Sequence, residues 1–262
     1  MLSYQHLYHA GNLADVQKHA LLCVMLEYLT RKDKPLSYLE THAGRGLYDL
    51  SAPEAEKTAE ARGGILRVDS DAWFPPDHPY AKRYRDIRAK FGEMAYAGSP
   101  LLAAGFLRAG DRMDLAELHP QELLALRNAM KGTGAKLHQQ DGFEMAFSKC
   151  PPTPRRGLLL IDPSYEVKAD YDQIAQAIPK LHKIWNVGVI ALWYPILTDN
   201  RQALMVRKLR AALPDALSHE VRFPPVREGH RMVGSGMFVV NPPWGLEQET
   251  SRLSQLFDGL TS

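Results

Sequence analysis

An uninterrupted apolar run, Gly157-Leu158-Leu159-Leu160-Ile161, ends abruptly at Asp162-Pro163. A short continuous run that stops at turn residues is typical of a strand buried on both faces of a parallel sheet. Similar runs recur along the chain with helical patterns between them, which predicts an α/β fold. The expected strands are 36–40, 113–118, 136–140, 158–161, 187–193, 219–223 and 237–240, and the clearest helices are 20–28, 121–130 and 203–213. Seven such strands fit a doubly wound sheet.

Residues 51–98 interrupt this alternation. The segment is polar and charged and contains Pro75, Pro76 and Pro79, and it is too long for a simple crossover helix. Because structureless loops of this length are uncommon, we expect a mainly helical inserted lobe with its clearest helix at 81–94. A long surface loop is the alternative. The whole chain, 1–262, is thus expected to form a single domain that carries the insertion at 51–98 as a subdomain.

Composition narrows the class of protein. The 262 residues are 45% hydrophobic, which suffices for a core, and no apolar run approaches the roughly 20 residues that span a bilayer. The N-terminus lacks the basic and then apolar order of a signal peptide, so a cytoplasmic protein is expected. Cys23 and Cys150 have no ligand spacing around them, so we expect buried or inert thiols and neither a disulfide nor a metal site.

Positive charge is clustered, although the formal net charge is only +2. Each cluster fits a solvated helix face, whereas several on one face would form a surface for nucleic-acid phosphates. The clusters are Arg83, Arg85, Arg88 and Lys90, then Arg155 and Arg156, and finally Arg201, Arg207, Lys208 and Arg210.

Carboxylates follow three successive expected strands, at Glu117, Asp141 and Asp162. Parallel strands bring their carboxyl ends to one edge, where ligands of open α/β sheets bind. Glu117 suits ribose hydroxyls, Asp141 suits an adenine amino group, and Asp162 is left to face the substrate. Each acid alone can instead be a helix N-cap. Together they outline a pocket for S-adenosylmethionine.

The turn after the first expected strand is rich in glycine. Gly44 and Gly46 would let the backbone approach a ligand closely, but Asp49 stands where a dinucleotide fingerprint has its third glycine. A nucleotide cofactor without a pyrophosphate therefore fits better. A plain tight turn from strand to helix is the alternative.

The tetrapeptide Asp162-Pro163-Ser164-Tyr165 suits chemistry on a flat base that carries an amine. Asp162 can accept a hydrogen bond from the amine while Tyr165 stacks on the ring. The unit Asn241-Pro242-Pro243-Trp244 is a competing candidate, but it follows the last strand, and we expect it to be a rigid structural turn. Amine methylation at Asp162 is the predicted reaction.

A resemblance to a known family joins these motifs over nearly the whole chain. In order they are Met1-Leu2-Ser3-Tyr4, His9-Ala10-Gly11-Asn12-Leu13-Ala14-Asp15-Val16-Gln17-Lys18-His19, Thr41-His42-Ala43-Gly44-Arg45-Gly46, Glu117-Leu118-His119-Pro120, Asp141-Gly142-Phe143, Asp162-Pro163-Ser164-Tyr165, Ala191-Leu192-Trp193-Tyr194-Pro195 and Asn241-Pro242-Pro243-Trp244. This set resembles the RlmJ-type 23S ribosomal RNA adenine-N6 methyltransferases. The resemblance implies a Rossmann-like class I methyltransferase fold, with a seven-stranded, mostly parallel sheet, a small helical insertion and an antiparallel last strand.

The resemblance also implies roles for individual residues. Asp162 is the expected catalytic acid, Pro163 and Tyr165 complete its motif, and Tyr4 and Lys18 are expected on the substrate side, where Lys18 would meet a phosphate or the methionine carboxylate. The family has a proline where this chain has Ser164, which leaves the loop less constrained. Cofactor contacts implied for S-adenosylmethionine are His19, His42, Ser99, Glu117, Asp141, Gly142 and Asp162, to which the glycine-rich turn adds Gly44 and Gly46.

The expected function is S-adenosylmethionine-dependent methylation of an adenine N6 in 23S ribosomal RNA, on naked or partly assembled RNA. The nearest alternative is methylation of adenine in DNA. A third is a nucleic-acid-binding protein weakened in catalysis by Ser164 and involved in the use of external DNA. We expect a monomer without an obligate protein partner.

Overall fold

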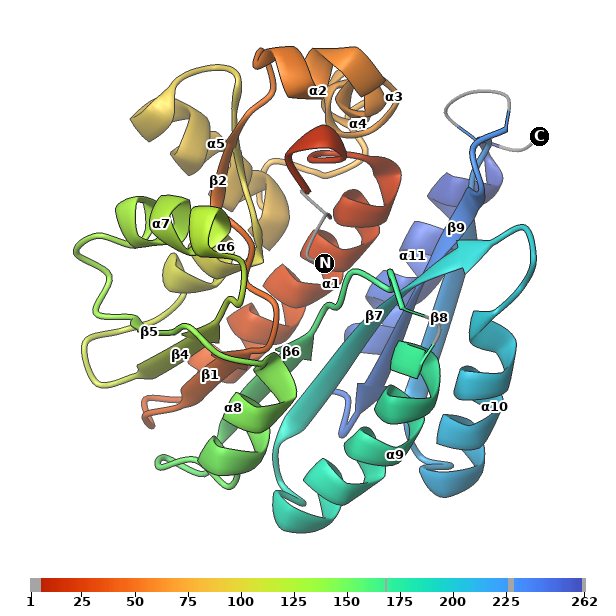
Figure 1. The fold of residues 1–262 in the computed structure, drawn as a ribbon. Coiled ribbons are helices and arrows are strands. Elements are labelled where there is room, and N and C mark those ends of the chain that lie inside the picture. The colour runs from red at the N-terminus through yellow and green to blue at the C-terminus, as the bar shows by residue number, and fades with distance from the viewer. Residues whose placement is uncertain (1–5, 168, 226–228, 261–262) are drawn as a thin grey trace.

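The computed structural model describes residues 6–167, 169–225 and 229–260 and centres on a seven-stranded sheet (Figure 1). The strands lie in the order β5-β4-β1-β6-β7-β9-β8. β9 runs opposite to the other six strands of this sheet, so the predicted α/β fold with a mostly parallel sheet is confirmed. The bounds are β1 Ser37–Glu40, β4 Arg112–Ala116, β5 Lys136–His138, β6 Gly157–Ile161, β7 Val189–Leu197, β8 Leu217–Arg222 and β9 Met232–Val240.

Two strands are longer than the sequence predicts. β7 continues to Leu197 and β9 begins at Met232, and these two residues pair with each other at the end of the ladder. Pro195 and Gly236 obscure the pattern, because proline and glycine are uncommon inside strands. A Cβ at position 236 would lie 2.2 Å from the ring of Tyr194, its partner on β7, so only glycine leaves room for that ring.

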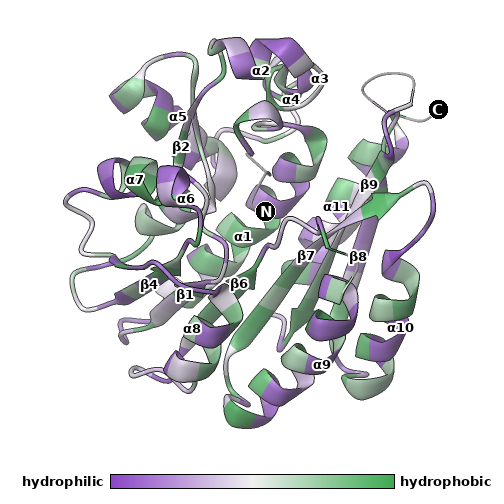
Figure 2. Ribbon diagram, in the orientation of Figure 1, coloured by the Kyte–Doolittle hydropathy of each residue, from purple (hydrophilic) through white to green (hydrophobic). Residues whose placement is uncertain are grey.

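Helices cover both faces of the sheet, whose central strands are hydrophobic (Figure 2). One buried cluster joins α1 and α11 to one face, and a second joins α8, α9 and α10 to the other. The bounds are α1 Leu13–Thr30, α6 Ser99–Ala104, α7 Pro120–Ala129, α8 Gly142–Lys149, α9 Ala169–Ile184, α10 Gln202–Ala212 and α11 Leu246–Asp258, preceded by a short 3₁₀ helix, η1, at His6–Tyr8.

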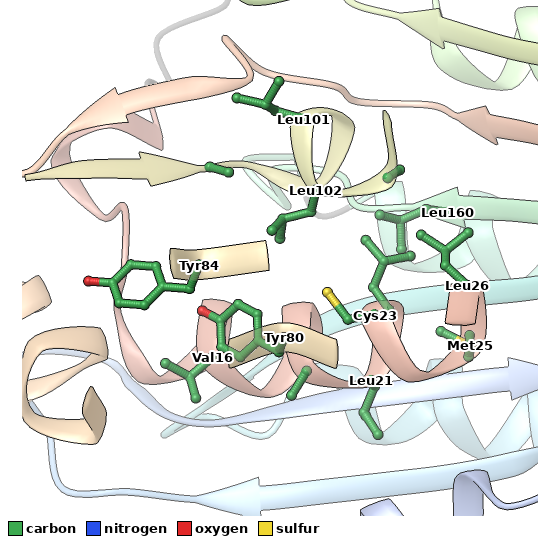
Figure 3. Packing of buried hydrophobic residues seen from close by; sticks show 14 of the residues in the cluster. Val16, Leu21, Cys23, Met25, Leu26, Tyr80, Tyr84, Leu101, Leu102 and Leu160 are labelled. Carbon is green, nitrogen blue, oxygen red and sulfur yellow. The ribbon is translucent and has the colours of Figure 1, made fainter. Parts of the chain in front are cut away.

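Helix α1 is enclosed by other elements on most of its surface. Its side chains pack among Tyr80, Tyr84, Leu101 and Leu102 of neighbouring helices (Figure 3). It begins at Leu13, well before the predicted start at residue 20. Its first two turns bury the polar residues Asp15, Gln17, Lys18 and His19, and buried polar residues leave no apolar periodicity to detect.

The segment 51–98 is mainly helical, and its last strand pairs with a strand that directly precedes the segment. β2, Leu47–Asp49, pairs antiparallel with β3, Ala95–Ala97, and between them lie α2 Pro53–Thr58, α3 Glu60–Gly63, α4 Ile65–Ser70 and α5 Pro79–Phe91. The predicted helix at 81–94 thus starts earlier, where the His78 side chain caps it, and stops before Gly92 at φ 112°. That the segment is a subdomain of a single domain stays a prediction.

The inserted segment is tied to the start of α1 by a buried carboxylate. Glu60 of α3 accepts a hydrogen bond from Asn12 Nδ2 at 3.0 Å and pairs with His9 Nδ1 at 2.8 Å. His230, from the connection between β8 and β9, lies 3.8 Å from the same carboxylate. Burial opposes the charge, but these partners outweigh it and hold the pKa of Glu60 below its usual value. Three segments far apart in sequence therefore meet at Glu60.

The two cysteines match the expectation of buried thiols. Cys23 and Cys150 are both free and buried, and burial raises the pKa of Cys150 to about 12. In the described ranges, no helix combines the length and the apolar character needed to cross a membrane.

Candidate active site

A cavity of about 1030 Å³ opens at the carboxyl edge of the parallel strands. Most of the predicted site residues line it together, although they come from α1, α6 and the ends of β1, β4, β5 and β6. Those that line it are Lys18, His19, His42, Gly44, Ser99, Glu117, Asp141, Gly142, Asp162, Pro163 and Tyr165. Tyr4 lies outside the described residues. Gly46 is not part of the lining.

Lys18 and Asp162 form the centre of the site. Lys18 Nζ donates to Asp162 Oδ2 at 2.7 Å and lies 3.0 Å from Asp15 Oδ1, and its side chain is only 5% exposed. Burial would lower the pKa of Lys18, but the carboxylates of Asp15 and Asp162 outweigh it and raise the pKa above the usual value. Lys18 was expected to meet a phosphate or the methionine carboxylate. In the structure, two carboxylates of the protein hold its ammonium group.

His19 presents a neutral ring to the cavity. Its Nδ1 lies 2.8 Å from Tyr96 Oη, and its Nε2 lies 4.0 Å from Asp15 Oδ1, too far for a hydrogen bond. Burial lowers the pKa of His19 to about 3. Nε2 is buried and has no hydrogen-bond partner among the described residues. Buried polar atoms are usually satisfied, so this nitrogen is a candidate contact for a bound ligand.

Glu117 and the glycine-rich turn hold each other in place. Glu117 accepts hydrogen bonds from Gly44 N at 2.8 Å and from His119 N at 2.7 Å, one on each carboxylate oxygen. Burial raises the pKa of Glu117 despite these donors. A carboxylate oxygen has a further lone pair, so Glu117 can still accept from a ribose hydroxyl.

Asp141 is a helix cap as well as a cavity residue. Its Oδ1 accepts from Phe143 N at 2.9 Å and Glu144 N at 3.0 Å at the start of α8, which is the N-cap alternative considered above. Both bonds use one oxygen, so capping is compatible with a ligand contact through Oδ2. A Cβ on the adjacent Gly142 would lie 2.0 Å from Thr41 O, so this glycine lets α8 approach the end of β1.

Tyr165 lines the cavity but is mostly packed against protein. It is 8% exposed and adopts φ 55°, its hydroxyl donates to Trp193 O at 2.7 Å, and its ring lies 4.8 Å from that of Tyr171. These contacts fix the ring at the cavity wall. Stacking of Tyr165 on a substrate base stays a prediction.

Ser164, in the same loop, is exposed, and its φ is not positive. We expect Ser164→Pro to fold and to methylate at least as well as the wild type, because proline removes freedom from the unfolded chain, on the order of 0.4–1 kcal/mol. Urea unfolding and initial rates of methyl transfer measure this. A clear loss of rate at unchanged stability would assign Ser164 a role of its own.

Two glycine or proline motifs have structural roles. Gly46 adopts φ 77°, and a Cβ there would lie 3.1 Å from Leu126 Cδ1, so it serves packing against α7 rather than the cavity. Asn241 follows β9, whose antiparallel direction takes it to the opposite edge of the sheet. There its Nδ2 donates to Asn186 O and Gly188 O. Asn241-Pro242-Pro243-Trp244 is therefore a structural turn, as predicted, but Trp244 is 75% exposed and does not serve as the packing residue that we expect from the sequence.

Three further residues at the site escaped prediction. Asp15 and Trp193 line the cavity. The Lys18 ammonium lies over the Trp193 ring, with Nζ 5.4 Å from the ring centroid. The third residue, Glu40, is wholly buried at the end of β1. Its carboxylate accepts hydrogen bonds from Ser99 Oγ at 2.5 Å and from Tyr38 Oη at 2.7 Å. The sequence signals for them are the position of Glu40 at a strand end and the places of Asp15 and Trp193 in motifs of the family resemblance.

Glu40 gives the protein a pH dependence of stability. Burial raises its pKa from 4.5 to about 8, although the Ser99 and Tyr38 hydroxyls favour the carboxylate. The folded state keeps a proton that the unfolded chain loses, so this contribution is full below about pH 4.5 and is lost as the pH rises to about 8.

We expect Glu40→Gln to remove that loss of folding free energy, which is on the order of 5 kcal/mol. Urea unfolding of the wild type and of the variant between pH 4 and 9 measures this, as the difference between their free energies of unfolding at each pH. His19 also makes stability depend on pH, with the opposite sign and below pH 6.5, but its contribution is the same in both proteins and cancels in the difference. A difference that does not change with pH would contradict the assignment.

The charges of the cavity suit a cationic ligand. Seven acids line it against the two cations Lys18 and Arg231, and these acids are Asp15, Glu117, Glu122, Asp141, Asp162, Glu166 and Asp170. A sulfonium cofactor with a ribose and an adenine fits this excess of acid, the acceptors at the ends of β4 and β5, and the unpartnered His19 Nε2. Within the described residues, no group of three or more His, Cys, Asp or Glu is arranged to hold a metal.

The strand order, the single antiparallel strand and the acidic cavity at the carboxyl edge define a Rossmann-like class I methyltransferase. Residues 33–259 match the family model described as ribosomal RNA large subunit methyltransferase D, RlmJ. The chain belongs to this family.

Individual relatives agree over almost the full length. The ribosomal RNA large subunit methyltransferase J of Escherichia coli is 40% identical over 260 residues, which cover 97% of this chain and 91% of that protein. Its counterpart from Haemophilus influenzae is 40% identical over 257 residues, with 97% and 92% covered. The crystal structure of a Legionella pneumophila protein superposes with a TM-score of 0.85 at 34% identity and covers 96% of this chain and 94% of that one.

Proposed function

We propose that the protein methylates the N6 atom of an adenine in 23S ribosomal RNA, with S-adenosylmethionine as the methyl donor. The observation that carries the proposal is the Lys18–Asp162 pair at the end of β6, on the wall of the acidic cavity. The names of the relatives support ribosomal RNA as the substrate, and the residue types of the site support an exocyclic amine. We also propose that the protein acts in the cytoplasm.

The residues of the chain divide the work of the reaction. Lys18 occupies Asp162 Oδ2, which leaves Oδ1 to accept one N6 hydrogen. We assign the other hydrogen to the carbonyl of Pro163, which lines the cavity. Holding both hydrogens directs the nitrogen lone pair away from them and toward the cofactor side of the cavity. When bound, S-adenosylmethionine supplies the methyl group. Asp162 then acts mainly by positioning, because the amine becomes strongly acidic only once it is methylated.

The cofactor side is formed by the other acids. We assign Glu117 to the ribose and Asp141 Oδ2 to the adenine amine, and His19 and Ser99 line the remaining part of the cavity. Tyr165, and Tyr4 from outside the described residues, are assigned to the substrate base.

The state of the RNA follows from the depth of the site. Asp162 is 14% exposed, so an adenine must leave its helix or stack to reach it. We therefore propose naked or partly assembled 23S RNA as the substrate, because assembled subunits restrict such extrusion.

Methyl transfer from labelled cofactor tests the proposal. The substrates are 23S RNA stripped of protein, intact large subunits and DNA, and digestion to nucleosides identifies the product. We expect N6-methyladenosine in the stripped RNA and much less label in the other two. Transfer only to DNA would instead support the DNA methyltransferase, and binding without any transfer would support a weakened enzyme.

A further inference from the structure

The ladder of β7 and β9 extends past the edge of the parallel sheet. Pairing between β6 and β7 stops at Ile161 and Leu192, but β7 continues through residues 193–197. In this part β7 pairs with β9, from Met237 to Met232, and with no other strand among the described residues. The two strands rise beyond the end of β6 in Figure 1. We call residues 193–197 and 232–237 the β7–β9 extension.

One face of the extension is apolar and forms a wall of the cavity. Trp193, Pro195 and Leu197 alternate along β7 and so share a face, and all three line the cavity with Met232, the partner of Leu197. Trp193 is held at its Nε1, which donates to Ser235 Oγ at 2.8 Å. The wall therefore runs from Lys18, beside Asp162, outward to the end of the ladder.

The outer end of the wall carries a surplus of positive charge. Arg201 and Arg231 both pair with the single carboxylate of Asp199, Arg231 at 2.5 Å, and Arg231 also lines the cavity. Their side chains are 33% and 55% exposed. Glu166 of the loop after β6 and Asp170 in the first turn of α9 also line the cavity, and their charges repel phosphate. A polyanion is therefore directed toward the arginines.

Other basic clusters are engaged differently. On α5, Arg83 and Arg85 donate to the carbonyl oxygens of Gly105 and Pro76, and Arg88 pairs with acids of the inserted segment. The arginines of the α5 cluster therefore bind neighbouring groups of the protein itself. Arg201, from the last of the three clusters, pairs with Asp199 just past the end of the apolar wall, whereas Lys208 pairs with Asp172 and Arg210 donates to Ser218.

We propose that the β7–β9 extension is the docking surface for single-stranded RNA next to the target adenine. An apolar wall that ends in arginines matches the two needs of a single strand, which are faces for its bases and cations for its phosphates. Bases contact Trp193 and Leu197, and phosphates contact Arg201 and Arg231. The assignment rests on the proposed RNA substrate and adds the path of the strand.

Binding without turnover tests this surface. A fluorescein-labelled single-stranded RNA of about one dozen nucleotides, within the site size of single-strand binders, is titrated by anisotropy at several salt concentrations without cofactor. We expect Arg201→Ala/Arg231→Ala to weaken binding about 10-fold and to reduce the salt slope by about 1. Calorimetry is expected to show unchanged affinity for S-adenosylmethionine.

Matched variants separate charge from shape. Arg31→Ala removes an arginine of similar exposure, 61%, that pairs with Glu27 at the far end of α1, and it should leave RNA binding unchanged. Asp199→Asn should tighten binding, since it frees both arginines. Leu197→Ser should weaken binding without changing the salt slope.

The outcomes are decisive in each direction. If the double variant binds RNA with the wild-type Kd and salt slope, or if Asp199→Asn weakens binding, the docking surface is wrong. Circular dichroism checks the fold of each variant. If the double variant misfolds, the RNA affinity of Asp199→Asn still tests the docking surface. Tighter binding of DNA of the same sequence would overturn RNA as the partner. Arginine-dependent RNA binding without methylation of 23S RNA would instead overturn the proposed function.

Discussion

Replacing Asp162 with asparagine is expected to lower the rate of methyl transfer on the order of 10²–10³-fold while S-adenosylmethionine still binds. The reason lies in Lys18, whose ammonium donates to Asp162 Oδ2 at 2.7 Å. An asparagine must turn its oxygen toward this ammonium, because its own amide is a donor. Its NH₂ group then faces the substrate amine, where an acceptor is needed. Single-turnover methylation and calorimetric titration of the cofactor measure the two quantities.

A double-mutant cycle tests this explanation. In Lys18→Met, the amide of asparagine is free to turn, so Asp162→Asn should cost less in that background than in the wild type. Lys18→Met itself should be slow, and it should be less stable because Asp15 loses a buried partner. Equal costs in the two backgrounds would show that Lys18 does not set the orientation of residue 162.

Alanine at Gly142 is expected to reduce the free energy of unfolding by about 3 kcal/mol and with it the amount of folded enzyme. The new Cβ would lie 2.0 Å from Thr41 O and 2.7 Å from Thr41 Cβ, contacts that force α8 away from β1. Asp141 caps α8, so the displacement also moves a predicted cofactor residue. Urea unfolding measures the loss.

Gly63→Ala is the matched control for this prediction. Gly63 lies at the end of α3, has no positive φ, and a Cβ there meets no atom within 4 Å. Its replacement should leave stability nearly unchanged or slightly raise it. Equal losses in the two variants would show that the contact with Thr41 is not the cause.

The sequence predicts those parts of the fold and site that local patterns encode. Asp162 and Glu117 follow strands with clear apolar runs, so their meeting at one edge follows from parallel topology. Asp15 and Trp193 reach the cavity only through tertiary packing. Asp15 lies in a buried helix turn rich in polar residues. Trp193 ends a predicted strand, but the continuation of that strand beside β9, which places it on the cavity wall, was not predicted.

Direction was as important as position. Asn241 and Asp162 both follow strands and both precede proline, but β9 runs opposite to β6, which sends them to opposite edges. Periodicity detects a strand and does not give its direction. The antiparallel last strand was expected only from the family resemblance. Gly46 shows the complementary limit, since a left-handed turn beside a cavity has the same residues whether it meets a ligand or a neighbouring helix.

The enclosure of α1 has a consequence for how the molecule comes apart. This helix contacts α5 of the inserted segment on one side and α11 and β9 on the other, and its cap residue Asn12 is bound by Glu60. Neither the insertion nor the sheet can lose its packing without exposing the same helix. The two parts therefore share one cooperative unit, and heat or denaturant should melt them in a single transition. Lys18 lies on that helix, so the position of its ammonium beside Asp162 depends on the packing of the same unit.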